Sequence, residues 1–264
     1  MQLQENLAQF ERAGIKVFAI SYDSVEALSA FANEFGITYA LLSDPDHRVI
    51  EATGILNTLI SPEEKAFYGI PFPGVYVVGT DGTIEEKLFY QHYRTRPSAA
   101  TVLREGFGVD FDITGSPHAD ASGEGVRVSV KLASAGMVFM ERAMLYVDFE
   151  LDDGLHLYGE PVPAGFTATS VEVSAAEGVV VEEPRYPPTT PFRVEGLPGT
   201  FNVFEGRLRV AVPIQSRMTE GDAFPLDVTV RFQACTDREC LLPQTRTFQL
   251  TVPIRPLARP KPAG

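Results

Sequence analysis

The chain has 264 residues, of which 44% are hydrophobic and 22% are charged, values that are ordinary for a globular protein. This length favours two domains. The formal net charge of -13 excludes nucleic acid as the main partner, because phosphate recognition needs a basic surface. No run of about 18 apolar residues is present, so the sequence predicts no membrane span.

The N-terminal residues bear on the cellular location, and the spacing of the histidines bears on metal binding. The first residues lack both the basic and the apolar segment of a signal peptide, so a complete chain would be expected in the cytoplasm. His47, His92, His118 and His156 have no second ligand at the spacing of a metal site. We therefore expect neither a metal nor another cofactor.

Residues 1–108 alternate between helical and strand patterns, which predicts a mixed α/β layer domain. The expected helices are 2–13, 24–35, a short one from Asp44-Pro45 and 98–105; the expected strands are 15–21, 39–42, 75–78 and 83–90. Asp81-Gly82 predicts a hairpin between the last two strands. The run 15–21 reads as a buried central strand, which needs neighbours on both sides, so we expect a strand of this domain before Met1.

The pattern changes after residue 108. A polar linker is expected over 109–125. Apolar alternation then predicts strands at 126–132, 143–151, 167–173, 179–181, 207–214, 226–233 and 245–252. About seven short strands at this spacing indicate an all-β immunoglobulin-like sandwich over 126–254. The Pro-rich basic end, 255–264, is expected to be a disordered tail.

Four stretches of the first domain carry a family resemblance. LAQFERAGIKVFAISYD (7–23), FGITYALLSDPD (35–46), YGIPFPG (68–74) and VVGTDGTI (77–84) resemble the latter part of a peroxiredoxin-like AhpC/TSA (redoxin) domain of the thioredoxin fold. In that family the helix that matches 2–13 directly follows the active-site cysteine, which sits at the helix N-terminus. This position lowers the pKa of the thiol and so favours the thiolate.

This sequence has no cysteine before residue 235, and two interpretations stay open. In the first, the thioredoxin-like domain is N-terminally incomplete, and the whole protein is expected to be extracytoplasmic, in the periplasm. In the second, the domain is a pseudo-redoxin that is retained for packing or binding.

A second departure from the family lies before the strand 75–78. Peroxidases of the family place an arginine there, whereas this chain has Phe72-Pro73-Gly74. Pro71 or Pro73 resembles the cis-proline that thioredoxins hold beside their active site. We therefore predict a substrate-docking turn at Pro71, Phe72 and Pro73. The alternative is a turn proline that only interrupts an edge strand.

The chain's two cysteines lie close together. Cys235 ends one strand run, and Cys240 precedes the next after four polar residues. Facing residues of a hairpin have Cα atoms about 4.5–5.5 Å apart, and a disulfide needs about 4.4–6.8 Å. The spacing therefore permits a bond. Closing so short a loop stabilises by only about 2 kcal/mol, which favours a redox role over a local structural disulfide or two inert reduced thiols.

The surroundings of the pair carry a second resemblance. The run VFEG (203–206) and the run FQACTDRECLLP (232–243) resemble the N-terminal, immunoglobulin-like domain of the transmembrane disulfide reductase DsbD and its disulfide bond corrector relatives, over about 125–253. In that family a cysteine pair on a β-hairpin passes electrons to periplasmic thiol proteins. The resemblance implies this role for Cys235 and Cys240.

Together these features predict a thiol–disulfide redox protein. Its activity would be thiol–disulfide exchange or peroxiredoxin-like antioxidant activity, with electrons passed through Cys235 and Cys240. Its partners would be other thiol or disulfide proteins. Whether the chain is an enzyme stays open, because as written the redoxin domain lacks its nucleophile. The alternative is a non-catalytic pseudo-redoxin that binds other thiol proteins.

Overall fold

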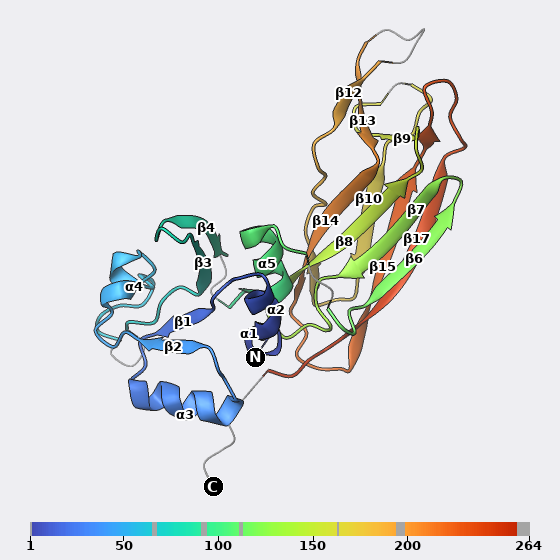
Figure 1. The fold of residues 1–264 in the computed structure, drawn as a ribbon. Coiled ribbons are helices and arrows are strands. Elements are labelled where there is room, and N and C mark those ends of the chain that lie inside the picture. The colour runs from blue at the N-terminus through green and yellow to red at the C-terminus, as the bar shows by residue number, and fades with distance from the viewer. Residues whose placement is uncertain are drawn as a thin grey trace. The chain divides into compact units, whose positions relative to one another are not determined.

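A computed structural model describes residues 2–64, 68–90, 94–110, 113–162, 164–193 and 199–257. The chain divides into two compact units, one within residues 1–111 and one within 112–256, and each is described by itself (Figure 1). In the described part of the chain, no helix has both the length and the apolar character needed to cross a membrane.

The described helices of the N-terminal unit are α1 (Gln2–Glu5), α2 (Leu7–Arg12), α3 (Val25–Phe35), α4 (Arg48–Ala52) and α5 (Ala99–Phe107). The two longest of them, α3 and α5, begin and end at capping residues. Ser24 and Ser98 accept hydrogen bonds from backbone N–H groups at the starts of α3 and α5. Gly36 and Gly108 end these helices in the left-handed conformation.

Two of the predicted helices differ from the expectation. The helix over 2–13 is interrupted at Asn6, whose side chain donates to the Gln2 carbonyl and competes with the helical pattern. The helix expected from Asp44 begins only at Arg48. The Asp44 carboxylate instead accepts the N–H groups of Val49 and Ile50, each at 2.9 Å, in the first turn of α4.

The strands of the N-terminal unit are β1 (Phe18–Ser21), β2 (Ala40–Ser43), β3 (Gly74–Val78), β4 (Ile84–Phe89) and β5 (Arg96–Pro97). The antiparallel pairing of β3 with β4 confirms the predicted hairpin. The run predicted as a buried central strand forms β1, and its Phe18 is 60% exposed. Among the described residues of this unit β1 pairs with β2 alone, in parallel, and a neighbour on its other side stays a prediction.

The C-terminal unit is a sandwich of two antiparallel sheets, as the sequence predicts. The first sheet has the order β11 (Val179–Val181), β14 (Arg207–Ser216), β8 (Glu141–Leu151), β7 (Val126–Leu132) and β6 (His118–Gly123). The second has the order β10 (Ser170–Ala175), β15 (Ala223–Phe232) and β17 (Gln244–Pro253). Phe149 of β8 and Phe232 of β15 meet edge to face, 5.6 Å apart, in the core between the sheets.

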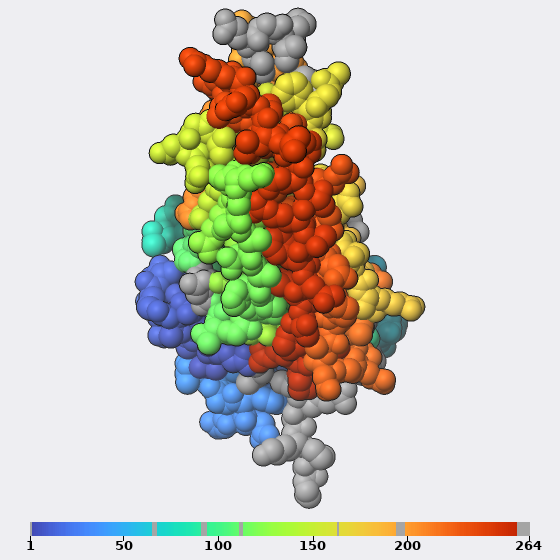
Figure 2. Space-filling model, turned by 90° about the vertical axis from the view of Figure 1, so that its right-hand side faces the viewer, coloured from blue at the N-terminus to red at the C-terminus, as the bar shows by residue number. Residues whose placement is uncertain are grey.

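The strand β6 lies inside the predicted linker 109–125, so that part of the linker prediction is wrong. In its sequence, HADASG, only the small residues Ala119 and Ala121 alternate as apolar residues of a strand do, and both pack against the core. The strand pairs with β7 along its whole length. From the other side, the Arg246 guanidinium of β17 donates to the carbonyls of Ala121 and Gly123 at 3.0 Å. Figure 2 shows β17 (red) beside the β6–β7 hairpin (green).

A smaller sheet caps one end of the sandwich, at the top of Figure 1. Its order is β12 (Thr190–Phe192), β13 (Phe201–Glu205), β9 (His156–Tyr158) and β16 (Ala234–Cys235). Gly206, in the left-handed conformation, joins β13 to β14, and Gln233 joins β15 to β16. Two long strands of the sandwich thus bend at these residues and continue into the small sheet. The predicted tail over 255–264 lies outside the described residues from 258 onward.

The core between the two sheets is expected to carry the stability of the sandwich. Leu145 of β8 is 0% exposed, whereas Leu242 is 83% exposed. We expect Leu145→Ala to lower the free energy of unfolding by about 2–5 kcal/mol, because it leaves a cavity in the packed core. Urea unfolding followed by far-UV circular dichroism measures this, with Leu242→Ala as the matched control. Equal losses in the two variants would contradict the assignment of the core.

Candidate functional site

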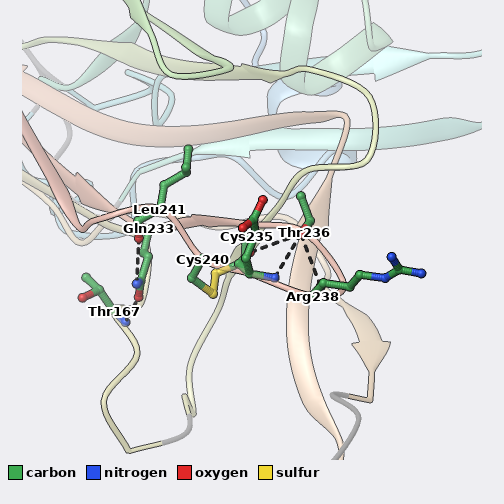
Figure 3. The surroundings of a disulfide bond; sticks show 8 residues. Thr167, Gln233, Cys235, Thr236, Arg238, Cys240 and Leu241 are labelled. Carbon is green, nitrogen blue, oxygen red and sulfur yellow. Dashed lines mark hydrogen bonds between the residues drawn. A yellow bond between two sulfur atoms is a disulfide. The ribbon is translucent and has the colours of Figure 1, made fainter.

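The two cysteines form a disulfide at the edge of the small sheet. Their sulfur atoms are 1.97 Å apart and their Cα atoms 4.0 Å apart. The bond that the sequence spacing permits is therefore formed, and the interpretation as two separate inert thiols is wrong. The turn between them is held by Thr236, whose hydroxyl accepts from the N–H groups of Arg238 and Glu239 (Figure 3).

The two halves of the disulfide differ in their exposure. Cys235 belongs to β16 and is 1% exposed. Cys240 lies beyond the turn and is exposed to solvent. A reagent that approaches from solvent therefore reaches Cys240, while Cys235 is packed against the protein.

The side chains of the small sheet alternate between two faces. Leu157, Phe204 and Ala234 belong to the large hydrophobic core of the sandwich. Their neighbours along the strands, Tyr158 and Val203, form a second cluster with Cys235. Because successive side chains of a strand point to opposite faces, this division assigns Cys235 to the face directed away from the main core.

On that second face three strands place Glu205, His156 and Cys235 in one row. In the antiparallel register Glu205 of β13 lies opposite His156 of β9, and His156 lies opposite Cys235 of β16. Directly opposed residues have Cβ atoms about 4.5–5.5 Å apart and share a face. The row therefore brings an imidazole next to the buried cysteine and a carboxylate next to the imidazole.

His156 is buried, with an exposed fraction of 2%, and its Nε2 atom has no hydrogen-bond partner among the described residues. Burial lowers the pKa of His156 below its ordinary value, because the cation loses its solvation. The negative charges of Asp237 and Glu205 act in the opposite direction and raise this pKa. Burial is the largest of these effects, so the pKa of His156 lies below its ordinary value although two carboxylates favour its cation.

Aromatic rings enclose His156 and the buried half of the disulfide. The ring centroid of Phe192 lies 4.4 Å and that of Tyr158 5.2 Å from the centroid of His156. Phe166 packs 5.0 Å from Tyr158, and burial raises the pKa of the Tyr158 phenol. These rings keep water from the face on which Cys235 lies.

Gln233 fixes the backbone on both sides of the cysteine turn. Its side-chain oxygen accepts from the Thr167 N–H at 2.9 Å, and its Nε2 donates to the Leu241 carbonyl at 3.0 Å (Figure 3). Gln233 is itself buried. One amide therefore ties the residue after Cys240 to the loop before β10.

The predicted docking turn lies in the N-terminal unit. Pro71 forms a bridge with Leu56, and the Phe72 N–H donates to the Ile55 carbonyl at 2.6 Å. The expected cis-proline is wrong: among the described residues the cis bond precedes Pro161, and Pro71 and Pro73 follow trans bonds, the default form. The segment is a paired strand-like stretch, and a docking role for Pro71, Phe72 and Pro73 stays a prediction.

The histidines fall in separate places. His47 precedes α4, His118 lies on β6, and His92 is outside the described residues. In the described part of the chain, no three His, Cys, Asp or Glu side chains gather as metal ligands would. In the sequence His156 is isolated, because Cys235 is distant from it along the chain. Only the strand pairing brings the two together.

Removal of the Gln233 amide is expected to loosen the loop beside the disulfide. In Gln233→Ala the Thr167 N–H loses its acceptor, so we expect its hydrogen exchange to accelerate by about tenfold or more, consistent with the 1–3 kcal/mol cost of an unpaired buried group. NMR-detected exchange measures this. Gln249→Ala, which removes an exposed bond to Asp227, is the control. Equal Thr167 exchange rates in both variants would contradict the anchoring role.

Comparisons with known proteins assign each unit separately. Residues 1–87 match the model of the AhpC/TSA family. Peroxiredoxin Bcp of Escherichia coli is 36% identical over 87 residues, which cover 31% of this chain and 52% of that protein. The chain thus spans about half the length of the curated relatives it matches. Both cysteines of the chain lie outside this match.

Residues 130–252 match the model described as thiol:disulfide interchange protein DsbD, N-terminal. Among solved structures, the N-terminal periplasmic domain of ScsB from Proteus mirabilis is 12% identical, with a TM-score of 0.37, over 51% of this chain and 52% of that chain. The N-terminal domain of DsbD from Neisseria meningitidis is 14% identical, with a TM-score of 0.30, over 52% of this chain and 85% of that chain. The chain therefore joins a segment similar to the AhpC/TSA family to a segment similar to the N-terminal domain of DsbD.

Proposed function

We propose that this protein exchanges thiols and disulfides, and that two electrons pass through the Cys235–Cys240 pair. The match to the DsbD N-terminal model supports this class of chemistry, and both cysteines lie within the matched residues. The observation that carries the proposal is the unequal exposure of the two halves of one disulfide.

The exchange begins at the exposed sulfur. A thiolate of a reduced partner protein attacks Cys240 Sγ, the bond to Cys235 breaks, and Cys235 leaves with the electron pair as a thiolate. The second partner thiolate then attacks its own sulfur in the mixed disulfide and releases Cys240 as a thiolate. The partner is oxidised to a disulfide, and the pair is reduced. The same steps in reverse pass the two electrons to the next disulfide.

The length of the loop argues against a purely structural role. The two cysteines are five residues apart, and so short a loop stabilises by only about 2 kcal/mol. The sandwich has an extensive buried core that does not involve the disulfide. A bond that adds little to stability and presents one cysteine to solvent is suited to exchange.

The partners that fit this site are proteins with accessible cysteine pairs. Disulfides persist in oxidising compartments, so we place the protein outside the cytoplasm, in the periplasm. For the N-terminal unit, whose matched segment contains no cysteine, we propose a supporting role in which Pro71, Phe72 and Pro73 help to dock such thiol proteins. Peroxiredoxin-like activity would need a thiol beyond this pair.

Single-cysteine variants of the full chain test the order of attack. In Cys235→Ser the remaining Cys240 thiol is exposed, and we expect it to form a mixed disulfide with oxidised glutathione. In Cys240→Ser the remaining Cys235 is buried, and we expect its reaction to be slower by about tenfold or more. Mass spectrometry of quenched samples measures both rates. Equal rates, or faster reaction of Cys235, would contradict Cys240 as the attacked sulfur.

A further inference from the structure

We propose that His156 moves the proton of Cys235 Sγ during exchange, an inference that rests on the proposed function of the disulfide. His156 lies directly opposite Cys235 in the register of β9 and β16. Both residues lie on the sheet face that is directed away from the main core. No other histidine lies on the described strands of the small sheet.

The unpaired Nε2 atom of His156 distinguishes it from a histidine that only fills space. Buried polar side-chain atoms usually have a hydrogen-bond partner, and this one has none among the described residues. The structure holds the cysteines in their oxidised form, in which Cys235 Sγ carries no proton. Reduction of the disulfide creates a thiol at the position directly opposite His156 in the register of β9 and β16.

The charges around the imidazole suit a group that takes up and returns a proton. Glu205 approaches from β13 and Asp237 from the turn after β16, and both favour the cation. The rings of Phe192 and Tyr158, which carry no charge at pH 7, also pack against the imidazole. Burial favours the neutral imidazole, and the two carboxylates stabilise its cation once it takes up a proton.

The proton and the electrons balance in each direction. When the pair is reduced, neutral His156 first takes up the proton that the attacking thiol of the partner releases. The S–S bond then breaks, Cys235 leaves with the electron pair, and the imidazolium gives this proton to that sulfur to form the thiol. When the pair is oxidised, neutral His156 takes the proton from the Cys235 thiol. The resulting thiolate attacks Cys240 Sγ in the mixed disulfide and releases the thiolate of the partner, which has gained the two electrons.

The pH dependence of disulfide reduction tests this role in the full chain. We compare the rate of reduction by dithiothreitol in the wild type, in His156→Gln and in His156→Phe, with His118→Gln on β6 as the control. Below pH 7 we expect the two His156 variants to be slower by about tenfold or more, in the range of general acid–base effects. The difference should shrink above about pH 9, where a thiolate leaves without a proton.

A second measurement separates proton transfer from a structural effect. In Cys240→Ser, Cys235 is the sole thiol, and its thiolate absorbance reports its pKa. We expect the additional change His156→Phe to raise this pKa by about one unit, because the thiolate loses the imidazole N–H as a hydrogen-bond donor. Unchanged pH profiles together with an unchanged thiol pKa would overturn the role of His156 and leave the proposed function standing. A wild-type disulfide that dithiothreitol does not reduce would overturn the proposed function and, with it, this inference.

Discussion

The alternation of side chains along β9 is the constraint on which the site depends. Leu157 is buried in the main core of the sandwich, and this fixes the neighbouring positions, His156 and Tyr158, on the opposite face. The strand β16 is bound to the same register by its pairing with β9. Cys235 therefore cannot leave the aromatic cluster without breaking the packing of Ala234 in the core. A slip of one residue would exchange the two faces.

The packed sandwich holds the site in place, and the disulfide lies at the exposed edge of the small sheet. Gly206 connects β14 to β13, and Gln233 connects β15 to β16, so two long strands of the sandwich continue directly into the small sheet. Cys235 and His156 are held in paired strands of the small sheet, whereas Cys240 lies beyond the turn and is exposed to solvent. The buried unpaired Nε2 is a local cost that the well-packed core can offset.

The sequence predicted the elements whose patterns are local and strong. The strand 126–132 was predicted with its observed bounds, because its apolar residues alternate without interruption. The strands β9 and β16 were missed, since two or three residues are too few to show a period. The strand β6 was missed because two alanines give only a weak alternation, while β7 and Arg246 bind its backbone.

For the site, too, the sequence predicts what depends on neighbouring residues and does not predict what depends on long-range strand pairing. The proximity of Cys235 and Cys240 follows from five residues of chain, so the disulfide could be expected. The opposed positions of Cys235 and His156 depend on the pairing of two segments that are distant in sequence, and no local spacing reports it. The cis-proline expected at Pro71 or Pro73 was a family feature, and the backbone pairing with 55–57 accommodates trans bonds instead.

The equilibrium reduction potential of the Cys235–Cys240 pair tests the central claim most directly. Thiol trapping and mass spectrometry of the full chain across a series of redox buffers give the potential at which half of the disulfide is reduced. An exchange pair should be half reduced at a potential above about -300 mV, within reach of cellular thiol proteins. A disulfide that stays oxidised down to more negative potentials would be a structural bond and would contradict the account.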